Sequence, residues 1–155
     1  MTKKNDIEIN IVNNVNANLI FSDEIYLITS IFKDFFNIKN KLVIDFIIES
    51  PDEIHRLNKE YRNVDKTTDV LSFGLDALDI YKNLDILPLG EIYLNYEQVK
   101  IQSREYNHSL KREFCYLYLH SLLHLYGYDH ILEEEANEMN AIAKEIMTLA
   151  KIERN

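Results

Sequence analysis

Residues 109–126 read SLKREFCYLYLHSLLHLY, and the segment FCYLYLHSLLHLY within them is apolar almost all the way round a helix. A helix with one apolar stripe lies on the surface of a domain, whereas a helix that is apolar on every side is buried. We therefore predict that Ser109 to Tyr126 forms the central helix of the fold. Its two histidines, His120 and His124, are then expected to be buried.

Hydrophobic spacing predicts two strands and a helix near the start of the chain. Ile7, Ile9 and Ile11 alternate with polar residues, as in a half-buried strand. The apolar run KLVIDFIIE, from Lys41 to Glu49, indicates a more fully buried strand. A helix is expected between them, with Ser22 as its N-cap.

The middle of the chain adds a helix and two further strands. Ser50 to Glu53 has the form of a capping box, with a hydroxyl at the N-cap, proline at N1 and glutamate at N3, and a short helix is expected from there to about Tyr61. Asp69 to Phe73 and Leu89 to Asn95 are expected to be strands, joined by a loop that contains Pro88.

Two more helices are expected beside the central one, from about Tyr96 to Tyr106 and from about Glu133 to the end. The resulting order of elements favours an α+β fold, in which a mixed four-stranded sheet is packed with about five helices. The central buried helix carries the histidines. With 155 residues, 46% of them hydrophobic, the chain is expected to form a single domain over residues 1–155.

Composition limits the classes of function. The net charge of −9 argues against a free-standing binder of bulk nucleic acid, because such proteins neutralise phosphates with excess lysine and arginine. The single cysteine, Cys115, excludes an intrachain disulfide and a thiolate metal cluster. No segment is apolar enough to enter a membrane or to direct secretion, so we expect a cytoplasmic protein without a membrane or disulfide-linked partner.

The spacing of three histidines predicts a metal site. His120 and His124 lie four residues apart on one helix face, although an isolated pair of this kind is equally consistent with buried histidines in ordinary hydrogen bonds. Gly127 can end the helix and reverse the chain, which brings His130 back over the same face. Three imidazoles with a fourth position open are typical of catalytic zinc, so we expect one Zn²⁺ per chain at His120, His124 and His130.

The same spacing, H-x-x-x-H-x-x-G-x-x-H, occurs in metzincin proteases. Those enzymes need a glutamate directly after the first histidine as general base, and this chain has Ser121 there. A serine hydroxyl does not take a proton from water near neutral pH. Peptide cleavage of the metzincin kind is therefore not expected, whereas metal-assisted hydrolysis of another substrate remains open.

Four stretches of the sequence resemble the YbeY family of bacterial endoribonucleases and rRNA maturation factors. The stretch HSLLHLYGYDH (120–130) is similar to the family's histidine motif, and LNKEYRNVDKTTDVLSF (57–73) is similar to its second long motif. LGEI (89–92) and NHS (107–109) resemble a strand and a helix-entering turn of the family. The resemblance spans nearly the whole chain.

This resemblance implies a zinc-dependent, single-strand-specific endoribonuclease that acts in 16S rRNA 3′-end maturation and ribosome quality control. It also implies ribosomal RNA and the small ribosomal subunit as partners, which would explain how an acidic protein reaches RNA. By the same match, Arg62 falls on a functionally important arginine of the family.

Chemistry independently allows Arg62 to act as a catalytic residue, because a guanidinium can grip a phosphate through two oxygens and stabilise charge on it. The alternative for Arg62 is an ordinary surface salt bridge. Asp69 is expected to support a turn or the start of a strand, and Asp129 either to orient a metal ligand or to make a turn after Gly127. Both aspartates are scaffold candidates.

Two other functions compete with a zinc-dependent RNA hydrolase. One is a metalloprotease, which the ligand spacing favours and Ser121 opposes. The other is a non-enzymatic zinc-binding ribosome assembly factor, whose metal would only hold the fold together.

Overall fold

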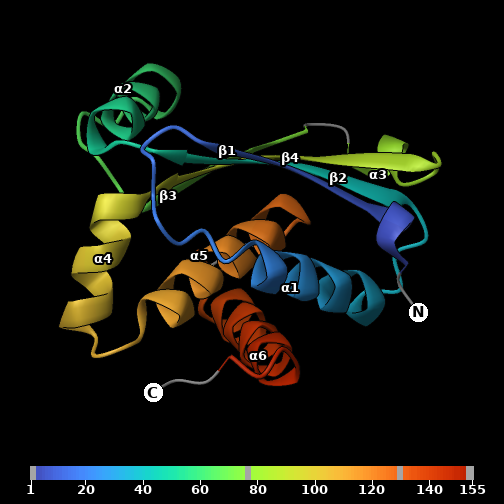
Figure 1. Ribbon diagram of the computed structural model, residues 1–155. Helices are drawn as coiled ribbons and strands as arrows, with labels where there is room; N and C mark the ends of the chain where they lie inside the picture. Colours follow the sequence, from blue (N-terminus) through green and yellow to red (C-terminus); the bar gives the residue numbers. More distant parts are fainter. Residues whose placement is uncertain (1–2, 76–77, 129–130, 153–155) are drawn as a thin grey trace.

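The computed structural model describes residues 3–75, 78–128 and 131–152, which form one four-stranded sheet and six α-helices (Figure 1). The strands are β1 (Ile7–Asn13), β2 (Lys41–Glu49), β3 (Val70–Gly74) and β4 (Ile86–Asn95). The helices are α1 (Ser22–Phe35), α2 (Pro51–Arg62), α3 (Leu78–Tyr81), α4 (Tyr96–Glu105), α5 (Leu110–Leu125) and α6 (Glu133–Leu149). The α+β class is confirmed, with one helix more than expected.

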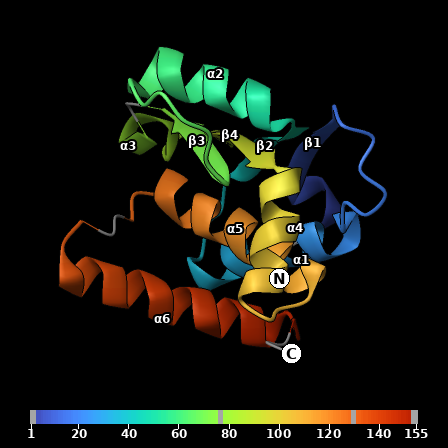
Figure 2. The same cartoon turned by 90° about the vertical axis from the view of Figure 1, so that its left-hand side faces the viewer.

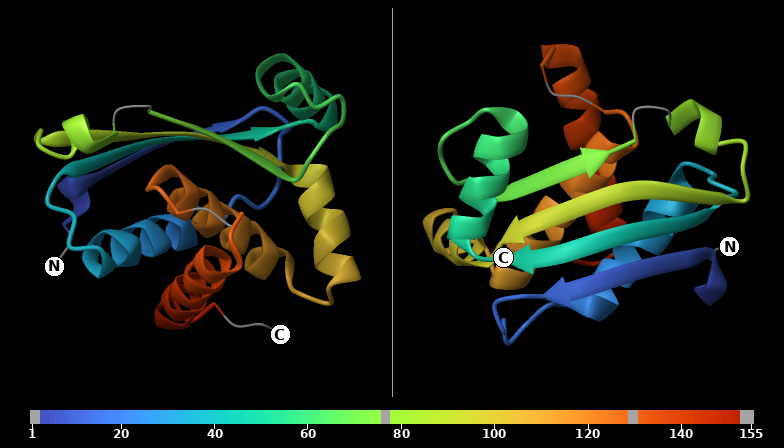
Figure 3. Two further views of the ribbon diagram at one scale, coloured as in Figure 1. Left: turned by 180° about the vertical axis from the view of Figure 1, so that it is seen from behind. Right: turned by 90° about the horizontal axis from the view of Figure 1, so that it is seen from above.

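The sheet is mixed, as predicted, and has the strand order β1-β2-β4-β3. β1, β2 and β4 run parallel, and β3 pairs antiparallel with β4 at one edge, as the view from above shows (Figure 3). Helices α1 and α5 lie against one face of the sheet with α6 beneath them, while α2 lies on the opposite face at one end (Figures 1 and 2). β3 is thus an edge strand of the sheet, and it lies next to α5.

Strand β2 is more fully buried than β1, as expected, because none of its residues is exposed, although only one of its faces is completely buried. Leu42, Ile44, Phe46 and Ile48 point toward α1 and α5 and have no exposed surface, whereas the alternate residues are partly exposed. The reason is that α1 and α5 cover one face of the sheet along its length, whereas no such pair of long helices covers the other face in the described part of the chain (Figure 1). A strand with one covered face alternates with a period of two.

Helix α5 is the central helix, as its sequence predicts. Tyr118 is fully buried, its ring packs on Phe46 of the sheet with 4.9 Å between ring centroids, and its hydroxyl bonds the hydroxyl of Thr29 on α1 at 2.7 Å. The hydrogen bond removes the cost of burying a hydroxyl. His120 and His124 are half-buried rather than buried, because this face of α5 looks into a groove instead of the core.

Two of the expected helix starts differ in detail. Ser22 is the first residue of α1 rather than its N-cap; Phe21 holds the cap position with φ 47° and makes no side-chain cap bond. At α2, the Ser50 hydroxyl accepts from the Glu53 amide as expected. The Ser50 amide donates to the Glu49 carboxylate instead of to that of Glu53, which is engaged by a nearby arginine.

The segment before Leu89 is not the expected loop. It contains the short helix α3, and β4 begins at Ile86, so Pro88 lies within a strand. Proline lacks the amide that a strand ladder uses, and here it sits where the pairing with β2 shifts register next to Val43. Within the described part of the chain, no helix is long and apolar enough to cross a membrane.

Candidate active-site groove

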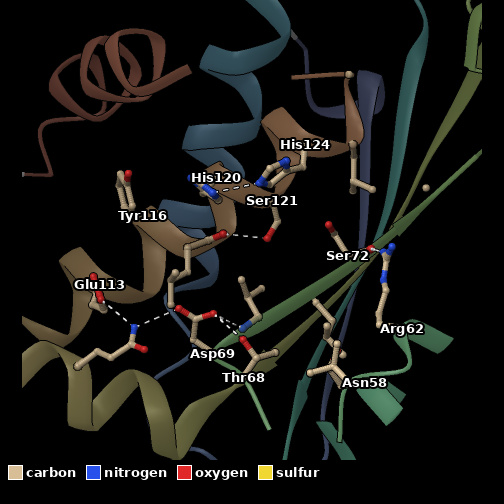
Figure 4. A pocket seen from close by; sticks show the side chains of 18 of the residues that line it. Asn58, Arg62, Thr68, Asp69, Ser72, Glu113, Tyr116, His120, Ser121 and His124 are labelled. Carbon is tan, nitrogen blue, oxygen red and sulfur yellow. Dashed lines mark hydrogen bonds between the residues drawn. The ribbon is translucent and has the colours of Figure 1, made fainter. Parts of the chain in front are cut away.

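A groove of about 1380 Å³ runs between α5 and the edge strand β3, and the end of α2 closes one side of it (Figure 4). Two of the predicted site histidines, His120 and His124, line this groove together with Arg62 and Asp69. Residues that are far apart in the sequence are therefore brought to one surface. The groove is the candidate active site.

Close packing at the C-terminal end of α5 fixes one wall of this groove. A Cβ atom on Gly90 would lie 2.4 Å from the carbonyl oxygen of Phe73 and 3.0 Å from Leu125 Cδ2. A Cβ on Gly74 would also lie 3.0 Å from Leu125 Cδ2. The paired glycines of β3 and β4 therefore let the end of α5, which carries His124, approach the sheet edge.

His120 and His124 point their Nε2 atoms toward each other at a distance of 3.1 Å (Figure 4). Two ligands of a tetrahedral zinc ion with bonds of about 2.0–2.1 Å lie about 3.3 Å apart. The observed separation is close to that value. The four-residue spacing on α5 thus converges both imidazoles on one point.

The turn after α5 fixes the orientation of His124. Gly127 has φ 109°, its amide donates to the His124 carbonyl, and the amide of Tyr128 donates to the carbonyl of Leu123. These bonds form the Schellman ending that the glycine predicts. The Tyr128 carbonyl oxygen lies 3.0 Å from His124 Nδ1, and because a carbonyl only accepts, Nδ1 carries the proton and Nε2 keeps its lone pair for a ligand.

The third predicted ligand, His130, and the scaffold candidate Asp129 lie outside the described residues. Among residues 3–75, 78–128 and 131–152, no three histidine, cysteine, aspartate or glutamate side chains gather as a metal-binding group. The described part of the predicted site is therefore the histidine pair in the groove. Its converging Nε2 atoms suit a metal that accepts imidazole nitrogen.

Arg62 is the last residue of α2, and its guanidinium lies over the edge of the sheet. It stacks on the ring of Phe73 at 4.8 Å and donates one hydrogen bond to the carbonyl oxygen of Ser72. It is exposed and forms no salt bridge within the described part of the chain. Its remaining N–H donors are available to a ligand in the groove.

The polar network around Asp69 forms the wall opposite α5. Asp69 Oδ1 accepts from the Val70 amide at 2.7 Å, and Asp69 Oδ2 accepts from Gln102 Nε2 at 3.3 Å. The same amide nitrogen of Gln102 donates to Glu113 of α5 at 3.2 Å. One glutamine thus joins two carboxylates across the groove, and Asp69 occupies the position at the start of β3 that was expected for a scaffold residue.

Ser121 is buried, and its hydroxyl donates to the Leu117 carbonyl one turn earlier in α5 at 3.0 Å. This bond keeps the hydroxyl within its own helix. The position of the zincin general base is therefore occupied by a neutral hydroxyl, which is too weak a base to take a proton from water near neutral pH.

The sequence reasoning missed several groove residues. Arg112 and Tyr116 precede His120 and His124 at intervals of four on α5, and all four line the groove. Figure 4 shows Tyr116, His120 and His124 in one row along the helix. The signal is present in the sequence, since a helix places every fourth residue on one face, and Arg112 and Tyr116 continue the spacing of the two histidines.

Comparison with known proteins adds an independent line of evidence. Residues 7–151 match the family model described as Endoribonuclease YbeY. Curated proteins named Endoribonuclease YbeY from Mycoplasmopsis pulmonis and Mycoplasmopsis synoviae are 45% and 43% identical to this chain; they cover 94% and 98% of it, and the matches take in 98% of each relative. A solution structure of a Thermotoga maritima protein matches with a TM-score of 0.60 at 26% identity, covering 92% of this chain and 91% of that one.

Proposed function

The chain belongs to the YbeY family of endoribonucleases, and from this membership we propose that it is a zinc-dependent hydrolase that cuts single-stranded RNA in the groove between α5 and β3. Membership over nearly the whole chain makes it an endoribonuclease. It is a nuclease rather than a protease or a non-enzymatic zinc protein. Zinc dependence, the substrate and the residue roles below are parts of the proposal.

The observation that carries the proposal is the convergence of two imidazole Nε2 atoms in the same groove as an arginine that makes no salt bridge in the described part of the chain. Hydrolysis of a phosphodiester needs an electrophile and a group that stabilises charge on the phosphoryl oxygens. Imidazoles suit a metal ion, which provides the electrophile. A guanidinium provides the group that stabilises charge on the phosphoryl oxygens. Neither group alone would distinguish a nuclease site.

The histidine pair fits zinc in both spacing and tautomer. The Nε2 separation of 3.1 Å is near that of two tetrahedral ligands, and the bond from His124 Nδ1 to Tyr128 leaves the coordinating nitrogen unprotonated. His120, His124 and His130 would hold the ion. A zinc ion bound there supplies a Lewis acid that polarises a phosphoryl oxygen and acidifies water.

Residues of the chain then position and stabilise the substrate. Arg62 donates to the oxygens of the scissile phosphate, where its fixed planar fork offers two parallel hydrogen bonds. Stacking on Phe73 and the bond to Ser72 hold this fork in place before substrate arrives. Such preorganised donors stabilise the charge that develops during cleavage without a reorganisation cost at that moment.

The proposed substrate is ribosomal RNA, at the 3′ end of the 16S molecule, with the small subunit as partner. The family likeness supports this assignment, and the charge of the chain is consistent with it. A protein with net charge −9 attracts RNA poorly at a distance, so delivery by a ribosomal partner would supply the affinity that its surface lacks.

The test measures zinc and RNA cleavage together. Purified protein is analysed for its metal content and incubated with single-stranded and duplex RNA, with and without a chelator, and its His124→Ala variant is treated alike. We expect close to one zinc per chain, cleavage of the single strand that the chelator abolishes, and loss of both properties in the variant, because removal of one of three ligands weakens zinc binding severely.

Three results separate the parts of the proposal. Full zinc content in His124→Ala would remove the ligand assignment. Undiminished cleavage in the presence of chelator would remove zinc dependence but leave the nuclease. Equal cleavage of 16S precursor RNA whether it is naked or within small subunits would remove the proposed role of the ribosomal partner.

A further inference from the structure

A continuous row of side chains extends from the histidine pair along α5. His120 and His124 have ring centroids 4.7 Å apart, Tyr116 lies 5.9 Å from His120, and the guanidinium of Arg112 lies 5.0 Å from the centre of the Tyr116 ring. All four are half-buried and line the groove. Along α5, the histidine pair is therefore followed by the aromatic ring of Tyr116 and then by the guanidinium of Arg112.

The spacing of this row suits a strand of nucleotides. Four residues of helix advance about 6 Å along its axis, which is of the order of one nucleotide step in an extended strand. Proteins that hold single strands combine aromatic or guanidinium surfaces for the bases with cations for the phosphates. Tyr116 and Arg112 together offer both kinds of group in the order that a strand passing the histidines would meet them.

We infer that Tyr116 and Arg112 form a binding subsite for the nucleotide next to the scissile phosphate, with the base against the Tyr116–Arg112 surface and the following phosphate on Arg112. This inference rests on the proposed cleavage at the histidine pair. Neither residue is catalytic, because both act away from the reacting atoms. Their role is to position the strand.

The opposite wall of the groove favours this orientation of the strand. Asp69, which accepts a hydrogen bond from Gln102, presents a carboxylate there that repels phosphate and can accept hydrogen bonds from base amino groups. The sugar-phosphate backbone is therefore kept on the Arg112 side. The subsite also accounts for preference for single strands, since a base stacked within a duplex cannot offer its face to a protein ring.

The experiment uses the full-length zinc-loaded protein and cleavage of a labelled single-stranded RNA. Two non-RNA competitors are compared as inhibitors: hexathymidylate, and a phosphate chain of the same length in which every nucleotide is an abasic tetrahydrofuran. The variants are Tyr116→Leu, Tyr116→Phe and Arg112→Gln. Tyr26→Leu on α1 and Arg104→Ala on α4 are the matched controls, because both residues are exposed and neither lines the groove.

We expect the parent to bind hexathymidylate more tightly than the abasic chain. Stacking of one base contributes roughly 5- to 150-fold in affinity, and a half-exposed ring should give the lower end of that range. Tyr116→Leu should lose this discrimination, whereas Tyr116→Phe and the controls should keep it. Arg112→Gln should lower the slope of log affinity against log salt by about 0.7, the value for one lost phosphate contact on a single strand.

Several results would overturn the subsite. They are equal inhibition of the parent by both competitors, parent-like discrimination in Tyr116→Leu, and an unchanged salt slope in Arg112→Gln. If Tyr116→Leu does not fold, the competitor comparison on the parent and Tyr116→Phe decides the matter. A parent that cleaves RNA but shows one of these results loses only the subsite, while a parent that cleaves no RNA refutes the proposed function as well.

Discussion

Replacement of Arg62 tests whether the groove works as a nuclease site or only holds the fold together. In the structure the guanidinium makes one hydrogen bond to Ser72 and stacks on Phe73 at 4.8 Å. An exposed hydrogen bond contributes about 0.5–1.5 kcal/mol and an exposed cation–π contact about 0.5–1 kcal/mol. Arg62→Ala should therefore lower the free energy of unfolding by about 1–2 kcal/mol, a fall in Tm of roughly 2–8 °C.

The expected effect on catalysis is larger than this loss of stability. Removal of one preorganised donor from a developing oxyanion costs about 3–4 kcal/mol, or roughly a hundred- to a thousand-fold in rate. Arg62→Lys should be intermediate, because lysine keeps the charge but not the planar fork that engages two oxygens. A protein destabilised by 1–2 kcal/mol remains folded at about 25 °C, so unfolding would not account for the lost rate.

The assay measures zinc content, Tm and the rate of RNA cleavage for both variants beside the parent. Arg56→Ala is the matched control, because Arg56 lies on the same helix and pairs with Glu53 and Glu60 outside the groove. Parent-like cleavage by Arg62→Ala would refute the catalytic assignment. Loss of zinc or of the fold in that variant would instead assign Arg62 a structural role.

Three further predictions follow from groups near α5. The purified protein should not degrade casein, because Ser121 stands where a zincin has its general-base glutamate. Casein cleavage that His120→Ala abolishes would contradict this. Burial raises the pKa of the Cys115 thiol to about 12. At about pH 8, iodoacetamide should therefore label this thiol only after the protein is unfolded in guanidinium. Fast labelling of the native protein, measured by mass spectrometry, would disprove this prediction. Gly127→Ala should lower the Tm by roughly 2–12 °C and weaken zinc binding, because φ 109° strains alanine by about 1–3 kcal/mol. No neighbour lies within 4 Å of the added methyl group, so the effect would come from the backbone alone. Calorimetry and metal titration that matched the parent would refute the role of this turn.

The sequence was most informative where one local pattern determines the structure. The all-round apolar surface of α5 predicts its central position, and Ser109 caps this helix by accepting from the Arg112 amide at 3.0 Å. Gly127 adopts the positive φ that its place after the helix predicts. Each of these features depends on residues within a few positions of one another.

Features that depend on contacts between distant parts of the chain could not be predicted from local sequence patterns. Pro88 indicates a loop because proline has no amide hydrogen for a strand ladder. It can lie within β4 because the pairing of β4 with β2 shifts register beside it. The half-exposure of His120 depends on the groove beside that face of α5, which no local pattern encodes. Arg62 reaches the groove because β3 lies beside α5, a consequence of strand order and not of the residues around the arginine.

The two walls of this groove are synthesised at different times, which determines when the groove can form. The N-terminal part of the chain carries Arg62 and β3, whereas every predicted metal ligand lies on α5 or after it. Domains form as the chain emerges from the ribosome, and contacts between distant segments form only when both are present. In a nascent chain the proposed cleavage groove therefore stays incomplete until α5 and the turn after it have been synthesised and α5 has packed beside β3.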